Sequence, residues 1–139
     1  MNRIRILPLI AAALLAACNG LLGDPGDARV AYEADRRAYT RNDEIVTTLF
    51  NASDQDVGYN LCGSPLEKQV GGAWVRVARN PESPCIQPLY ILRPGETATY
   101  REPASHVPAP GTYRLRTRVE TPVPGDWIEV TTGPFTVLE

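Results

Sequence analysis

Hydrophobic and polar residues alternate in short runs from residue 28 onward, and proline, glycine or a polar turn ends each run. The clearest run spans 111–120, where every second side chain is apolar or threonine and arginines stand between them. A period of two is the pattern of a strand with one buried face. Such a strand turns Tyr113, Leu115, Thr117 and Val119 to one side and Arg114, Arg116 and Arg118 to the other.

The same pattern along the chain predicts an all-β domain. No segment keeps a helical period beyond a turn or two, and prolines and glycines separate the runs. Gly71 and Gly72 predict a tight hairpin, because glycine adopts positive φ at little cost. We expect seven or eight short strands in a sandwich of two sheets, with 36–43 as a connection. The segments richest in strand-forming residues are 30–35, 44–51, 57–62, 66–70, 74–78, 89–92, 97–100, 111–120, 127–132 and 135–139.

Residues 1–17 have the build of an export signal, with Arg3 and Arg5 ahead of an apolar run at 6–15. That run is shorter than the roughly 20 residues that a membrane-spanning helix needs. No second apolar stretch of that length follows in the sequence. We therefore expect the segment to direct export and to be removed.

Cys18 follows this signal where an ordinary export signal needs only another small residue. The order Leu15, Ala16, Ala17, Cys18 resembles the lipobox of bacterial lipoproteins. The resemblance implies cleavage before Cys18, a thioether from its sulfur to diacylglycerol, and acylation of its new amino group. Several acyl chains, at about 0.8 kcal/mol per buried methylene, give durable anchoring in a bilayer. The alternative is a plainly secreted protein in which a cysteine follows the signal by chance.

The expected domains are therefore the signal at 1–17, a flexible tether at 18–27 and one folded domain at 28–139. About ten flexible residues reach about 17 Å on average, which keeps the domain close to the membrane. We expect a location in the cell envelope. If the host has an outer membrane, Asn19 after the lipidated cysteine resembles the pattern of lipoproteins sent to it, on its periplasmic side or its surface.

The charge balance excludes one class of partner. The chain has 14 basic and 16 acidic residues, and removal of Arg3 and Arg5 with the signal takes the net charge from −2 to about −4. A nucleic-acid binder carries a basic footprint, so we expect no nucleic-acid partner. The same balance gives no reason for attraction to anionic lipid headgroups.

Cys62 and Cys85 remain once Cys18 carries the lipid. In an oxidising compartment an isolated pair of cysteines is most simply a disulfide, which we predict here. A loop of this length would stabilise the fold by about 3.4 kcal/mol in the chain-entropy model. Zinc held by both cysteines and His106 is the alternative, although no close-spaced pair of ligands supports it.

Catalytic and metal-binding patterns are weak, so we expect neither an enzyme nor a cofactor or metal. His106 is the single histidine, and no glycine elbow frames Ser64, Ser83 or Ser105 as its nucleophile. The sequence from Asp54 begins like a calcium loop but has proline where the bidentate glutamate belongs. An irregular calcium site there with Asp56 and Asn51 stays open, as does a turn between strands. Asn51 also begins an Asn-Ala-Ser glycosylation sequence, although the end of a strand is the simpler interpretation.

Three features could bind a partner. Arg114, Arg116 and Arg118 could present guanidinium groups to phosphate or carboxylate, or could be paired across strands on a solvated face. Trp74 and Trp127 could form a platform for sugars or could cover the sheet. The loop 79–88 is stiffened by proline and ends near Cys85, so it could block a protease or serve as a constrained connection.

Four motifs occur in order between residues 39 and 119: Asn-Ala-Ser at 51–53, Gly-Gly-Ala-Trp at 71–74, Leu-Arg-Pro-Gly-Glu at 92–96 and Pro-Gly-Thr-Tyr-Arg-Leu at 110–115. This arrangement is similar to small bacterial immunoglobulin-like domains, including those of the intracellular proteinase inhibitor (BsuPI) family. The resemblance implies an immunoglobulin-like fold and, as an alternative function, protease inhibition. Cys62 and Cys85 lie outside the inhibitor pattern, and the export signal departs from an intracellular role.

These observations together predict a non-catalytic lipoprotein that acts as a binding or accessory module in the cell envelope. Its expected partners are the lipid bilayer, through Cys18, and another envelope protein. The alternative is a protease inhibitor that presents the 79–88 loop. The sequence sets neither the identity of the partner nor the oligomeric state.

Overall fold

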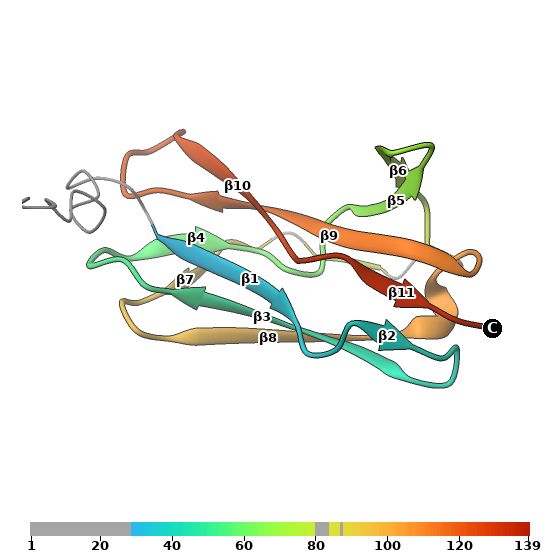
Figure 1. Cartoon of the computed structure of the whole chain (residues 1–139). Coiled ribbons are helices and arrows are strands. Elements are labelled where there is room, and N and C mark those ends of the chain that lie inside the picture. Colours follow the sequence, from blue (N-terminus) through green and yellow to red (C-terminus); the bar gives the residue numbers. More distant parts are fainter. Residues whose placement is uncertain (1–28, 80–83, 87) are drawn as a thin grey trace, which may run out of the picture.

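The computed structural model describes residues 29–79, 84–86 and 88–139. These residues form eleven strands and a single turn of 3-10 helix, so the all-β prediction is confirmed (Figure 1). The elements are β1 (Val30–Ala34), β2 (Ala38–Tyr39), β3 (Glu44–Asn51), β4 (Val57–Tyr59), β5 (Leu66–Val70), β6 (Ala73–Val77), β7 (Tyr90–Leu92), β8 (Thr97–Pro103), η1 (Ala104–His106), β9 (Gly111–Glu120), β10 (Trp127–Thr131) and β11 (Phe135–Val137).

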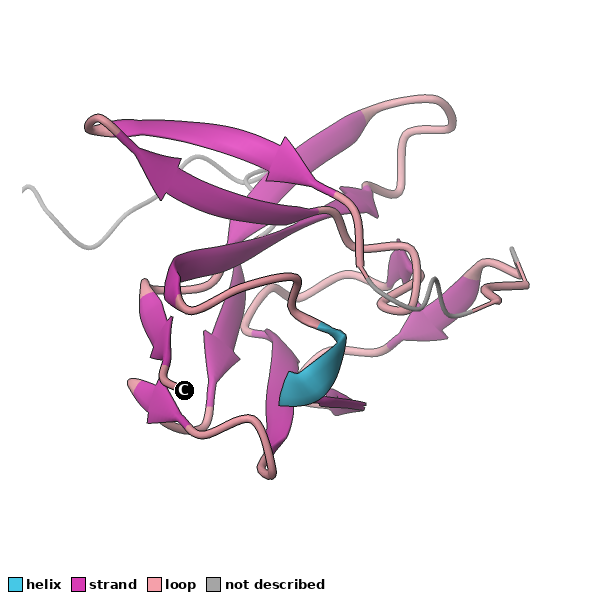
Figure 2. Ribbon diagram, turned by 90° about the vertical axis from the view of Figure 1, so that its right-hand side faces the viewer, coloured by secondary structure: helices cyan, strands magenta, loops and turns pink. Residues whose placement is uncertain are grey.

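Two sheets pack into the predicted sandwich. One holds β1, β3 and β8 in that order, all antiparallel. The other follows the path β2, β11, β9, β4, β7, with β10 and β5 also paired to β9 and β6 paired to β5. In Figure 1 the β5–β6 hairpin stands out from the body of the sandwich, and Figure 2 shows the helical turn η1 in cyan among the strands.

The strand β9 organises the second sheet because it is paired along both of its sides. On one side it pairs with β11 and then β10, and on the other with β5 and then β4. The register shifts by one residue between β10 and β11, so residues 132–134 form a bulge between them. Thr132 fills this break: its side chain accepts the Leu115 N–H at 3.0 Å and its own N–H donates to the Leu115 carbonyl at 2.9 Å.

The structure has more strands than the seven or eight predicted. Ten of the eleven strands correspond to the ten segments that are richest in strand-forming residues, so each of those segments forms a strand of its own. The eleventh is β2, which lies in the segment 36–43 that the sequence predicts to be a connection.

The core lies between the sheets and is lined by the predicted face of β9. Its residues from 113 to 119 alternate between buried and more exposed, as the period of two requires. Opposite them, Ile45 and Leu49 of β3 are fully buried. The largest fully buried side chains are Tyr39, Tyr113, Phe135, Ile45, Leu49, Leu66, Leu115, Val57, Val107, Val119, Val137 and Asn51.

Tyr39 explains why β2 forms where the sequence shows no strand pattern. Its ring is 1% exposed and meets Phe135 edge to face, with the ring centroids 5.5 Å apart. The hydroxyl donates to Asp35 at 2.6 Å, and burial followed by this hydrogen bond raises the pKa of Tyr39. The buried ring therefore holds two residues parallel to β11.

Asn51 closes the end of β3 with a fully satisfied buried amide. Its Nδ2 donates to the carbonyls of Gln55 and Leu92 at 2.7 and 2.9 Å, while its Oδ1 accepts the Ser53 N–H and hydroxyl. The side chain is 0% exposed. Asn51 therefore ends a strand and shapes the following turn, which is the simpler of the two interpretations of the Asn-Ala-Ser sequence.

Arg79 and Glu102 form an ion pair that joins the two sheets. Arg79 follows β6 and Glu102 lies on β8. Arg79 Nε lies 2.6 Å from Glu102 Oε2, and Arg79 Nη2 donates to Oε1 at 3.2 Å and to the Ser64 carbonyl at 2.8 Å. The Glu102 side chain is only 3% exposed. A charge this far from water depends on its partner, so the pair fixes where the chain leaves β6.

Replacement of this carboxylate, Glu102→Gln, is expected to lower the free energy of unfolding by about 3–5 kcal/mol, because Arg79 would stay largely buried without its counter-charge. The matched control is Glu44→Gln, which breaks the Arg101–Glu44 pair at 3.3 Å, where both side chains are more than half exposed. That loss should stay within about 1 kcal/mol. Urea unfolding followed by tryptophan fluorescence measures both, and equal losses would contradict the role given to Glu102.

Candidate functional site

Between β4 and β5 the chain leaves the side of β9. We call this segment, residues 60–64, the detour, and it shapes the outer surface of the second sheet. Tyr59 pairs with Val119, and the next contact to β9 comes when the Pro65 carbonyl accepts the Arg116 N–H at 3.0 Å. Residues 60–64 therefore run outside the ladder. The outer face of β9 lies open beside them.

The predicted disulfide pins this detour. Cys62 and Cys85 are bonded, with their Cα atoms 5.6 Å apart, so the prediction is confirmed. Asn60 adds a second clamp, since its Nδ2 donates to the carbonyls of Ile86 at 3.1 Å and Pro88 at 3.0 Å. Sequence reasoning found the disulfide, but it gave no role to Asn60.

The arginine stripe lies on the outer face of β9, as predicted, and two of its members are held by a buried carboxylate. Glu67 on β5 is 5% exposed. Its Oε2 lies 2.7 Å from Arg114 Nε, and its Oε1 lies 3.2 Å from Arg116 Nε. Arg116 also reaches Glu129 on β10 at 3.4 Å. Pairing across strands, one of the two interpretations of the stripe, therefore accounts for Arg114 and Arg116.

Both tryptophans stand against the ends of the stripe. Arg114 lies over the ring of Trp74, 4.5 Å from its centroid, and Arg118 lies over Trp127 at 5.5 Å. Trp74 is half-buried on β6, whereas Trp127 on β10 is 38% exposed. Trp74 therefore covers the sheet, and Trp127 keeps an accessible surface.

A groove of about 720 Å³ runs between the detour and β10, over the middle of β9. Arg116, Thr117 and Arg118 lie along β9, and Arg76 comes from the hairpin. It joins segments that are far apart in the sequence because the detour is held away from β9. Its remaining lining residues are Asn60, Gly63, Pro65, Pro88, Leu89, Glu120, Trp127 and Glu129.

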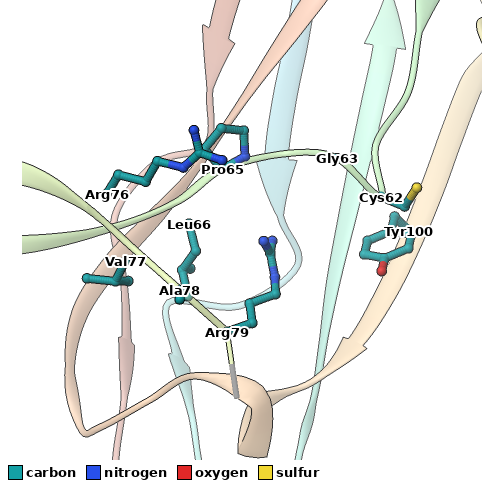
Figure 3. Close-up of a pocket in the computed structure, with 9 residues that line it drawn as sticks. All are labelled: Cys62, Gly63, Pro65, Leu66, Arg76, Val77, Ala78, Arg79 and Tyr100. Carbon is teal, nitrogen blue, oxygen red and sulfur yellow. The ribbon is translucent and has the colours of Figure 1, made fainter. Parts of the chain in front are cut away.

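A smaller hollow of about 280 Å³ lies on the other side of the detour (Figure 3). In Figure 3 the Arg79 side chain points into the space between Leu66 and Tyr100, and Cys62 stands at the rim. Burial raises the pKa of Tyr100, and the Glu102 carboxylate adds to the rise. Because the Arg79 guanidinium is already engaged by Glu102 and Ser64, this hollow is part of the structural clamp.

Exposed apolar side chains lie on β7, the last strand on its side of the sheet, and on the chain just before it, where Leu89 also lines the groove. Ile86, Leu89, Tyr90 and Ile91 are between 45% and 76% exposed. Leu89 lies directly over Gly58, where a Cβ would stand only 2.9 Å from its Cδ2. We call Ile86, Leu89, Tyr90 and Ile91 the apolar rim. The only signal for it in the sequence is the short run at 89–92, which looks like a buried strand.

A pair of tyrosines lies where the rim meets β4. The Tyr59 and Tyr90 rings stand 5.7 Å apart and are tilted by 36°. Burial raises the pKa of Tyr59, and the neighbouring Tyr90 adds to the rise. The Tyr59 phenol beside the rim therefore stays neutral at ordinary pH.

Other predicted features lie apart from the groove or outside the described residues. Cys18, the signal and the tether fall outside them, as do Ser83 and part of the 79–88 loop. His106 belongs to η1, and Ser64 is 1% exposed in the interior. Across residues 29–79, 84–86 and 88–139, no three His, Cys, Asp or Glu side chains are grouped to hold a metal ion. The same residues contain no helix long and apolar enough to cross a membrane.

Comparisons with known proteins give no family for the chain. No protein-family model matches it, and no curated protein does. Among solved structures, the β-glucosidase of Listeria innocua in complex with isofagomine matches with 16% identity and a TM-score of 0.35, and the same enzyme in complex with gluconolactone with 16% and 0.33. Each match covers 81% of this chain and 17% of the enzyme. This likeness is too low to bear on activity.

Proposed function

We propose that this protein is a lipid-anchored, non-catalytic binding module of the bacterial cell envelope. It would hold another envelope protein against the open edge of β7. The observation that carries the proposal is the apolar rim: Tyr90 and Ile91 are exposed on the edge strand β7, and Ile86 and Leu89 are exposed on the chain just before it. Proteins usually protect such edges with charges or proline, because an exposed apolar edge invites pairing with another chain.

The mode of binding follows from the edge. An extended segment of the partner would add to β7 through main-chain hydrogen bonds, and alternate side chains would rest on the rim. The Leu89 side chain packs against Gly58 of β4, in space that a Cβ at position 58 would fill, and is still 45% exposed next to the strand. The disulfide and Asn60 fix the chain just before β7, so little ordering would be needed on binding.

The anchor supports the proposal through the resemblance of residues 15–18 to a lipobox. In the variant Cys18→Ser the thioether cannot form, so the protein should move from the membrane fraction to the soluble fraction of its host. Mass spectrometry of the purified wild-type protein should show acyl chains on residue 18. An unmodified residue 18 on a freely soluble wild-type protein would contradict the anchor and leave the binding role to be judged separately.

Photocrosslinking in intact cells tests the binding edge. A photoreactive residue at position 91, in place of the 58% exposed Ile91, should capture one discrete protein partner. The matched control is position 99, where exposed Thr99 lies on β8, an edge strand of the other sheet. Ile91→Lys should abolish capture from a crosslinker at position 86, because a charge blocks strand addition. Equal capture at positions 91 and 99, or no capture at 91, would refute the proposed edge.

Protease inhibition is the second candidate, and one observation favours it. Ile86 is 76% exposed directly after the disulfide, and Asn60 donates hydrogen bonds to the Ile86 and Pro88 carbonyls. A rigid backbone with a protruding side chain is what a blocking loop needs. Stoichiometric inhibition of a periplasmic or secreted protease, lost in Ile86→Asp or after cleavage of the loop, is the expected result. Inhibition that survives both changes would exclude this loop.

A further inference from the structure

We propose that the groove over β9 binds a saccharide that carries a carboxylate. This site is distinct from the rim edge that would receive a protein, although Leu89 lies at the border of both. The inference goes beyond the proposed function and rests on the charges, the exposed ring and the acceptors that face the groove.

Two guanidinium groups of the groove are available to an anion. Arg76 is exposed and lies opposite Glu67 in the β5–β6 ladder, yet both Glu67 oxygens are taken by Arg114 and Arg116. Within the described part of the chain Arg76 forms no ion pair, and neither does Arg118, whose contact is the ring of Trp127. A guanidinium fork suits a carboxylate because it can donate two parallel hydrogen bonds.

Two carboxylates restrict how much negative charge the groove accepts. Glu120 and Glu129 line it beside the arginines. Glu129 is shared with Arg116, and Glu120 Oε1 accepts the Gly125 N–H at 3.3 Å. A polyphosphate or nucleic-acid strand would meet repulsion from both. A ligand with one negative charge and several hydroxyl groups would be accepted, since the remaining oxygens accept hydroxyl hydrogen bonds.

Trp127 supplies the apolar surface that such a ligand needs. The ring is 38% exposed and borders the groove, and Arg118 lies over it at 5.5 Å from the centroid. A sugar ring has an apolar C–H face that packs on an aromatic plane, while its edge carries the hydroxyls. The groove volume of about 720 Å³ falls among pockets that hold small ligands, roughly 300–1,000 Å³. Ring, cations and acceptors together favour a sugar acid over an acidic peptide, which would make little use of the exposed ring.

Calorimetric titration of the folded protein tests the assignment with three sugar acids that each carry one carboxylate, galacturonic acid, glucuronic acid and N-acetylmuramic acid, each compared with its own methyl ester. At least one acid should bind and the ester should bind at least tenfold more weakly. Arg76→Ala and Trp127→Ala should each lower the affinity for the acid at least tenfold. The control Arg101→Ala, on β8 in the other sheet, should leave the affinity for the acid unchanged.

Several results would overturn the assignment. These are no measurable binding of any of the three acids at millimolar concentration, equal affinity for acid and ester, or tighter binding of a polyglutamate peptide than of any sugar acid. Unfolding curves of Arg76→Ala and Trp127→Ala must match the wild type; if Trp127→Ala is unstable, Arg118→Ala replaces it. Ile91→Lys should keep sugar binding, and Arg76→Ala should keep crosslinking at position 91, so the groove and the protein-binding edge can fail independently.

Discussion

Pairing of β9 on both sides is the constraint from which the rest of this structure follows. A strand of ten residues meets four shorter strands, two on each side, and each side must break where one partner gives way to the next. One break is the bulge filled by Thr132, which keeps the ladder almost continuous. The other is the detour of residues 60–64, which no hydrogen bond to β9 fills and which therefore becomes a surface feature.

Covalent and ionic contacts keep the detour open. The Cys62–Cys85 bond and Asn60 hold it to the chain before β7, and the Arg79–Glu102 pair holds the exit from β6 to the other sheet. The groove and the apolar rim thus share one set of supports, although they differ in chemistry.

The arginine stripe shows how pairing separates structural from available charge. Glu67 is buried by the hairpin and binds Arg114 and Arg116, so these two arginines stabilise the attachment of β5 to β9. Arg118 lies beyond its reach and rests on Trp127. Arg76 lies opposite Glu67 in the β5–β6 ladder, but both oxygens of that carboxylate already pair with Arg114 and Arg116. One buried acid thereby decides which cations remain open to a ligand.

The sequence by itself determined the features that depend on local pattern. Alternation in 111–120 gave the buried and outer faces of β9, Gly71 and Gly72 gave the hairpin, and an isolated pair of cysteines gave the disulfide. Only the tertiary structure decided that β2 pairs through buried Tyr39, that Glu67 is shared, and that β7 lies exposed at an edge. Periodicity records which side of a strand meets the core. Contacts between residues far apart in the chain decide which strands become neighbours and which edge stays unpaired. The local pattern of hydrophobic and polar residues does not encode these contacts.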